Sequence, residues 1–180
     1  MARYVAFLRA VNVGGRVVKM DALRRLFESM TFANVETFIA SGNVIFEARQ
    51  SDASRMEQAI EKQLVGALGF SVATFVRSIP ELVALTQHPL FADGAVESGT
   101  ALFVAFARST PSAEAKRKLR SSSGDVDAFE FHKADVLWLR RGAYHESKFS
   151  GPALEKTLGM PMTVRNSTTV RKIAAKYGSR

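Results

Sequence analysis

The segment VETFIASGNVIFEA, residues 35–48, decides the fold. It contains two β-rich runs, 35–40 and 44–48, separated by the short polar sequence Ser41-Gly42-Asn43. Runs rich in β-branched and aromatic residues on either side of a short glycine-containing loop are typical of a β-hairpin. We therefore predict two strands joined by a turn at these three polar residues.

The segments on either side of the hairpin complete a known order of elements. Upstream, the near-continuous apolar run 4–13 predicts a buried strand, and apolar residues at helical spacing in 20–30 predict a helix. Downstream, the same spacing predicts a helix over 56–67, and 71–77 predicts a further strand. The order is β-α-β-β-α-β, the ferredoxin-like unit in which two helices cover one face of a four-stranded antiparallel sheet.

The second half of the chain shows a similar order without any repeat in sequence. Its predicted elements are a strand at 100–107, a helix at 112–121, a hairpin within 129–139, a helix at 152–158, a strand at 162–164 and a helix at 170–177. We predict an α+β protein of two small α/β subdomains: a ferredoxin-like sandwich at 1–91 and a related variant with extra C-terminal helices at 100–180. Residues 92–99, rich in Gly, Ser and Asp, are the expected linker.

Composition excludes several classes of function. The chain has no cysteine, which removes disulfides, thiolate catalysis and thiolate-bound metals and suits a reducing compartment. The three histidines lie far apart without metal-binding spacing, so no metal site is expected. No other cofactor is expected either. No apolar run is long enough to cross a bilayer, and Arg9 interrupts the only stretch that resembles a secretory leader. We therefore expect a cytoplasmic protein with no membrane partner.

Positive charge is concentrated at the two ends of the sequence. Residues 1–20 and 156–180 together hold ten Lys and Arg and no Asp or Glu, which exceeds the net charge of +8 for all 180 residues. A local excess of charge is what a surface that binds anions requires. Residues that bind an anion are therefore expected in the motifs within these two ends.

The first motif is Phe7-Leu-Arg-Ala-Val-Asn-Val-Gly-Gly15. Because a guanidinium is rarely buried alone, Arg9 either pairs with a carboxylate of the protein or faces a groove where it meets an anionic ligand, together with Asn12. Gly14 and Gly15 either let the backbone approach a ligand or simply form the turn that glycine permits. Neither a P-loop nor a dinucleotide-binding glycine fingerprint is present.

The second motif is Thr163-Val-Arg-Asn-Ser-Thr-Thr-Val-Arg-Lys172. Arg165 stands before Asn166, Thr168 and Thr169, and no carboxylate competes for the positive end of the helix that follows. Amides, hydroxyls and a guanidinium at a helix N-terminus are the groups that bind an anion. The alternative is that one of these side chains only caps the helix while Arg165 is solvated.

Two further clusters have simpler explanations. Lys116, Arg117, Lys118 and Arg120 form the densest basic cluster, but their place in the latter half of a helix favours compensation of the helix dipole over a binding role. The sequence Tyr144-His-Glu-Ser-Lys148 contains the residue types of a catalytic triad, but adjacent residues rarely point at one centre and no nucleophile-elbow motif accompanies them.

The chain resembles the bacterial family of domain of unknown function 1697. The resemblance rests on Phe7-Leu-Arg-Ala-Val-Asn-Val-Gly-Gly15, Ser41-Gly-Asn-Val-Ile-Phe46 and Thr163-Val-Arg-Asn-Ser-Thr-Thr169, and it covers essentially the whole chain. It implies two α/β subdomains, the first ferredoxin-like, and no established activity. The chain departs from the family pattern at Ala10, where glycine is usual, and at Ser167, where an aromatic residue is common.

Three functions remain open. The first is a noncatalytic binding module for a phosphate-bearing partner, with nucleic acid as the leading case. The second is an enzyme or sensor for a small anionic metabolite, bound by Arg9, Asn12, the Ser41-Gly42-Asn43 turn and Arg165-Asn166. The third is a structural protein whose motifs serve folding alone. The usual RNA-recognition surface is not expected, because the third strand offers only Phe46 as an aromatic residue.

Overall fold

The computed structural model describes residues 1–39 and 42–179, which form two compact units, Met1–Glu81 and Leu82–Arg180. The division between the units falls within a helix, Ile79–Thr86, ahead of the segment 92–99 in which the sequence predicted the linker. We describe each unit by itself.

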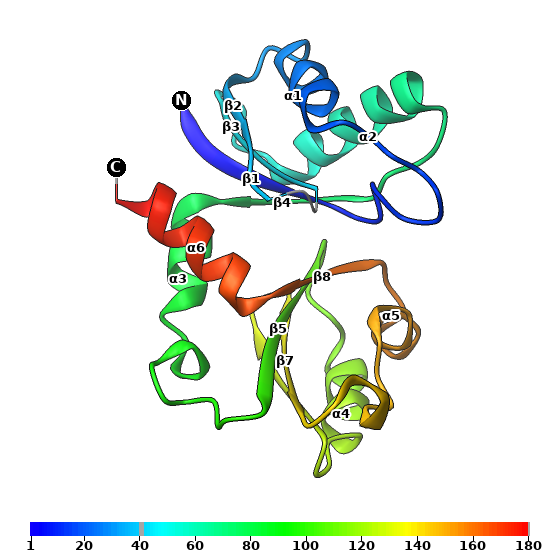
Figure 1. Cartoon of the computed structure of the whole chain (residues 1–180), viewed down its shortest axis with the longest axis vertical. Helices are drawn as coiled ribbons and strands as arrows, with labels where there is room; N and C mark the ends of the chain where they lie inside the picture. Colours follow the sequence, from blue (N-terminus) through cyan, green and yellow to red (C-terminus); the bar gives the residue numbers. More distant parts are fainter. Residues whose placement is uncertain (40–41, 180) are drawn as a thin grey trace. The chain divides into compact units, whose positions relative to one another are not determined.

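The first unit has the predicted ferredoxin-like order (Figure 1). Its elements are β1 (Ala2–Leu8), α1 (Met20–Glu28), β2 (Ala33–Thr37), β3 (Asn43–Ala48), α2 (Ala53–Leu68) and β4 (Thr74–Ser78). All strand pairs are antiparallel, in the sheet order β2-β3-β1-β4. This order places β1 and β3, the two most apolar strands, at the centre of the sheet.

The core of the first unit lies between one face of this sheet and the helices α1 and α2. Alternate residues of β1 point to this face, so Tyr4, Ala6 and Leu8 are buried together. Leu23 and Phe27 of α1 pack on them, with further apolar residues from α2. The apolar faces of the helices, which repeat every 3.6 residues, therefore pack in one cluster with the apolar face of the sheet, which repeats every two residues.

The first strand is shorter than the sequence predicted. Instead of extending over 4–13, β1 ends at Leu8. The Arg9 amide still donates to the Ala73 carbonyl at 2.9 Å, but Ala10 then adopts φ 56°, in the left-handed region. The backbone therefore leaves the sheet at Ala10, and the apolar side chain of Val11 returns to the core from a turn rather than from a strand.

The second unit repeats the topology of the first. Its elements are α3 (Ile79–Thr86), η1 (Pro89–Phe91), β5 (Thr100–Ala107), α4 (Ala113–Ser121), β6 (Asp127–His132), β7 (Asp135–Arg141), η2 (Tyr144–Glu146), α5 (Gly151–Leu158), β8 (Met162–Asn166) and α6 (Ser167–Gly178). The antiparallel sheet order β6-β7-β5-β8 corresponds strand for strand to β2-β3-β1-β4. The prediction of two similar α+β subdomains, the first ferredoxin-like, is confirmed.

Helices lie on both faces of the second sheet (Figure 1). On one face, Leu119 of α4 and Leu154 of α5 join Trp138 and alternate residues of β5 in an apolar cluster. The helix α6 packs on β5 and β8 and lies beside α3 on the other face. No helix in the part of the chain that the structure describes combines the length and apolar character needed to span a bilayer.

Candidate functional site

Residues of the first motif shape the loop that contains them. The Asn12 Oδ1 accepts a hydrogen bond from the Val18 amide at 2.6 Å, which closes the loop between β1 and α1. Gly14 and Gly15 have φ of 62° and 80°, and no atom lies within 4 Å of a Cβ built on either. The glycines therefore permit a turn, and no close approach of the described chain occupies the place of their missing side chains. Arg9 is half-buried at the end of β1.

The polar residues of the hairpin between β2 and β3 hold that hairpin together. Gly42 has φ 75°, and its carbonyl accepts from the Leu8 amide at 2.8 Å. Asn43 has no exposed surface, and its Nδ2 donates to the Phe38 carbonyl at 3.0 Å. Asn43 therefore stabilises the turn from the inside of the protein. Ser41, the remaining predicted site residue of this turn, lies outside the described residues.

The second motif forms the junction between β8 and α6. Asn166 is the N-cap of α6, and its Oδ1 accepts from the Thr168 amide at 2.8 Å. Arg165 Nη1 donates to Thr163 Oγ1 at 2.8 Å and to the Val164 carbonyl at 3.0 Å. Burial lowers the pKa of the Arg165 guanidinium to about 10.

The strand register separates the two polar residues of this motif. Arg165 pairs with Val104, and Asn166 pairs with the next residue of β5 toward its start, Phe103. Because consecutive side chains of a strand point to opposite faces, Arg165 and Asn166 do not point at one centre. Asn166 and Thr168 border a surface hollow, whereas Arg165 and Thr169 do not.

This hollow, of about 410 Å³, lies at the start of α6. It is lined by residues of three segments: Ala92, Asp93, Gly94 and Val96, then Thr100, Ala101 and Leu102, then Asn166, Ser167, Thr168 and Arg171. Arg171 is the cation of the hollow, and it pairs with the exposed Asp93 at 3.6 Å. Positive and negative groups therefore offset each other at this hollow.

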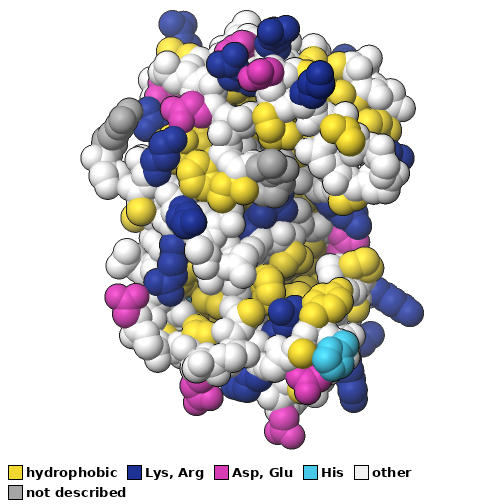
Figure 2. Space-filling model, in the orientation of Figure 1, with side chains coloured by type: hydrophobic (Ala, Val, Ile, Leu, Met, Phe, Trp, Pro, Cys, Tyr) yellow, Lys and Arg dark blue, Asp and Glu magenta, His cyan; other side chains and the backbone are white. Residues whose placement is uncertain are grey.

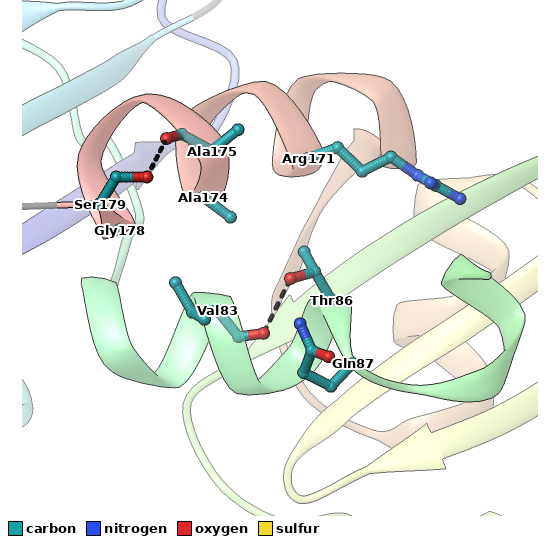
Figure 3. Close-up of a pocket in the computed structure, with 8 residues that line it drawn as sticks. All are labelled: Val83, Thr86, Gln87, Arg171, Ala174, Ala175, Gly178 and Ser179. Carbon is teal, nitrogen blue, oxygen red and sulfur yellow. Dashed lines mark hydrogen bonds between the residues drawn. The ribbon is translucent and has the colours of Figure 1, made fainter. Parts of the chain in front are cut away.

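A second hollow, of about 390 Å³, lies between α3 and α6 (Figure 3). Arg171 lies toward one end of it and Ser179 at the other. The Thr86 hydroxyl donates to the Val83 carbonyl at 2.7 Å, and the Ser179 hydroxyl donates to the Ala175 carbonyl at 3.2 Å. These hydroxyl protons are already engaged by the helices that carry them, and Gln87 and Arg171 are the other polar side chains that line the hollow.

The residues that the structure describes form neither a metal cluster nor a catalytic triad in the segment Tyr144–Lys148. No group of three or more His, Asp or Glu side chains there is placed to hold a metal ion. In the segment Tyr144–Lys148, the Ser147 hydroxyl donates to Asp127 Oδ1 at 2.7 Å instead of to a histidine. Glu146 Oε2 accepts from the Ala143 amide at 2.6 Å. These bonds shape a loop and activate no nucleophile.

The basic cluster of α4 lies beside an aromatic ring. Lys116 Nζ is 5.4 Å and Arg120 Cζ is 5.1 Å from the centre of the Phe131 ring on β6. Within residues 1–39 and 42–179, none of the four cations of α4 forms an ion pair. On the face seen in Figure 2, Lys and Arg side chains are spread over the surface with Asp and Glu among them. Cations without ion pairs therefore lie next to an aromatic ring at α4.

A second aromatic group of residues was not found from the sequence. Arg140 Cζ lies 4.9 Å from the ring centre of Phe103 and 5.2 Å from that of Tyr144. Phe103 is in turn 5.1 Å from Trp138. Trp138 and Arg140 are two residues apart on β7 and so share a face, which is the only signal that the sequence carries. We call these four residues the Tyr144 column.

Comparison with protein families shows to which family the chain belongs. A family model described as a protein of unknown function, DUF1697, matches residues 1–137. The chain belongs to the DUF1697 family. No curated protein matches it. A solved structure of a conserved bacterial protein from Streptococcus pneumoniae is similar at 22% identity, with 99% of each chain covered and a TM-score of 0.77.

The structural likeness shows the fold of this DUF1697 chain and no more. Both the predicted family and the predicted fold class are therefore confirmed, while the predicted site residues stay predictions. The meeting of the two basic ends around Arg9, Asn12, Arg165 and Asn166 also stays a prediction. Among the residues described, the densest group of cations without ion pairs in this DUF1697 chain is that on α4.

Proposed function

We propose that this DUF1697 protein is a noncatalytic binding module for a phosphate-bearing partner, with nucleic acid as the leading case, and that its second unit binds the partner. The observation that carries the proposal is the group of cations on α4, which form no ion pair among the described residues and two of which frame Phe131. The cysteine-free composition fits the cytoplasmic setting that such binding needs.

The distribution of charge between the units supports this choice. The segment Leu82–Arg180 holds 15 of the 25 Lys and Arg residues but 9 of the 17 Asp and Glu residues, so it carries +6 of the net charge of +8. Neutralisation of phosphates by Lys and Arg supplies most of the nonspecific affinity for nucleic acid. The second unit therefore has the stronger attraction for a polyanion.

The arrangement of the cations on α4 also supports it. At 3.6 residues per turn, Lys116, Arg117 and Arg120 fall on one side of the helix, whereas Lys118 falls on the other side of buried Leu119. Of these, Lys116 and Arg120 lie next to Phe131. Compensation of the helix dipole accounts for cations in the last turn. It does not require Lys116 and Arg117, which lie ahead of that turn.

The sheet of the first unit is not the proposed binding surface. Phe46, the aromatic residue that the third strand offers, has no exposed surface. Its ring centre lies 4.4 Å from that of Phe32 and 5.8 Å from that of Tyr4, inside the core. Base stacking on this strand in the manner of an RNA-recognition sheet would require Phe46 to leave that core.

Titration of a fluorescent oligonucleotide at several salt concentrations tests the proposal. The variant Lys116→Gln/Arg117→Gln/Arg120→Gln should weaken binding and reduce the slope of log affinity against log salt by roughly 2 to 3, about one for each lost phosphate contact. The matched control, Arg24→Gln/Arg25→Gln/Arg55→Gln, removes three charges from helices of the first unit. Equal effects of the two variants, or no salt-dependent binding by the natural protein, would overturn the proposal.

A further inference from the structure

The Tyr144 column runs from the interior of the second unit to its surface. Its inner end is Trp138, which is 3% exposed and whose Nε1 donates to Asp127 Oδ1 at 2.8 Å. Its outer end is Tyr144, which is 64% exposed. Between them the Arg140 guanidinium lies between the rings of Phe103 and Tyr144. One ring of the column is therefore presented to solvent.

The loop that carries Tyr144 is held by hydrogen bonds on both sides of it. Before it, the Ala143 amide donates to Glu146 Oε2 at 2.6 Å. After it, the Ser147 hydroxyl and the Lys148 amide donate to the buried carboxylate of Asp127 at 2.7 Å and 3.3 Å. The chain on both sides of Tyr144 is therefore anchored before any ligand arrives, which lowers the entropy cost of binding to this loop.

The column is not fully explained by the stability of the fold. The buried Nε of Arg140 has no hydrogen-bond partner among the described residues, which is costly for a guanidinium nitrogen. Tyr144 gains little by burial, because most of its surface stays in water. An exposed aromatic ring backed by a cation has the geometry that a stacking ligand uses.

We propose that Tyr144 is a stacking platform for an unpaired nucleobase, so that this protein binds nucleic acid as a single strand. The inference rests on the proposed function and names the form of its partner. In a duplex both faces of each internal base are covered by neighbouring bases, whereas an unpaired base can stack on a protein ring. The exposed cations Arg141 and Lys148 lie close to Tyr144 in sequence and supply positive charge for the phosphates that flank such a base.

The acidic groups near the platform do not prevent this binding. Asp127 is buried and accepts three hydrogen bonds. Glu146 is exposed but accepts from the Ala143 amide. Asp125 is exposed, and Arg141 Nη1 donates to the Gly124 carbonyl at 3.5 Å and to the Asp125 carbonyl at 3.4 Å, both long hydrogen bonds. A phosphate can therefore replace these weak contacts of Arg141.

Two probes of equal length test the inference, a twelve-nucleotide single strand and its blunt duplex, each with a 2-aminopurine base and a terminal dye. Tyr144→Ala should lower the affinity for the single strand roughly tenfold, because one stacked base contributes about 1–3 kcal/mol. It should leave the affinity for the duplex and the salt slope unchanged. Tyr144→Phe, which keeps the ring, should bind as the natural protein does and quench 2-aminopurine as strongly.

The outcomes separate this inference from the proposed function. If Tyr144→Ala binds the single strand as well as the natural protein does, or loses affinity for both probes equally, the stacking platform is wrong while binding through α4 can still hold. If the natural protein binds neither probe, both proposals are wrong. Because Tyr144 is exposed, we expect Tyr144→Ala to fold, and the far-ultraviolet circular dichroism spectrum checks this.

Discussion

The indole Nε1 of Trp138 donates a hydrogen bond of 2.8 Å to Asp127 Oδ1, and both side chains are buried. Asp127 stands at the first position of β6, while Trp138 lies on the neighbouring strand β7. The same carboxylate accepts from the Ser147 hydroxyl and the Lys148 amide. One buried charge therefore joins the second sheet to the loop between β7 and α5.

The variant Trp138→Phe should lose this bond and keep most of the apolar contact. A hydrogen bond to a charged group contributes about 1.5–3 kcal/mol, so the free energy of unfolding of the second unit should fall by about that amount. Urea unfolding followed by circular dichroism measures it, because Trp138 is the sole tryptophan and the variant has no indole fluorescence. Unchanged stability would show that the bond contributes nothing net.

Gly42 should tolerate substitution less than Gly14 does. At Gly42 an added Cβ would lie 3.1 Å from the Leu8 carbonyl oxygen, and φ is +75°. At Gly14, φ is +62° and no atom lies within 4 Å of an added Cβ. We expect Gly14→Ala to cost about 1 kcal/mol from its backbone conformation alone, and Gly42→Ala to cost clearly more. Equal unfolding midpoints for the two variants would contradict the close approach of Gly42 to β1.

Ala10 is expected to be a position where glycine stabilises the protein. Its φ of 56° lies in the left-handed region, which costs an alanine about 1–2 kcal/mol relative to the right-handed region. Glycine adopts this φ freely but also gains freedom in the unfolded chain, which offsets part of the benefit. Ala10→Gly should therefore raise the free energy of unfolding, measured by urea titration, by roughly 0.5–1 kcal/mol, and a lower value would refute the assignment of strain.

Acidification should destabilise the second unit through His132. Burial, with a contribution from Lys133, lowers the pKa of this imidazole below its usual 6.5, and Asp135 partly opposes the shift. The unfolded chain then takes up a proton more readily than the folded protein. The contribution of His132 to the free energy of unfolding is therefore complete above about pH 6.5, and it is lost as the pH falls through the lowered pKa of the folded protein.

Urea unfolding of the natural protein and of His132→Gln, at about pH 7.5 and about pH 5.5, measures this effect. We expect the free energy of unfolding of the natural protein to fall more steeply on acidification than that of the variant, so the two values should converge at the lower pH. Parallel pH dependences would mean that the buried Nε2 of His132 is protonated as easily in the folded protein as in the unfolded chain.

The order of the elements could be predicted because it depends on local patterns. The hairpin within 35–48 interrupts the alternation of strand and helix, and this alone indicates the ferredoxin-like order. The end of β1 was predicted wrongly, because an apolar sequence through Val13 does not reveal that Ala10 takes a left-handed conformation. Periodicity reports which face of an element is apolar, not where the backbone turns.

The directions in which the candidate site side chains point could not be predicted from the sequence. Arg165 and Asn166 are adjacent in sequence, but the register of β8 on β5 sends their side chains to opposite faces. The Tyr144 column joins Phe103, Arg140 and Tyr144, which are brought together only when β5 pairs with β7. Motif spacing therefore could not indicate either which way Arg165 and Asn166 point or which residues strand pairing brings together, and the predicted site residues stay predictions.

The shared topology of the two sheets has a consequence for biosynthesis. Every strand of the first sheet precedes residue 79, so the ribosome has made all of it before β5 begins. Domains generally fold as units during translation, the N-terminal one first. The nascent chain can therefore fold the first sheet before the strands of the second are made. A ribosome stalled within the second unit, after β4 has left the exit tunnel, should carry a first unit that already resists proteases.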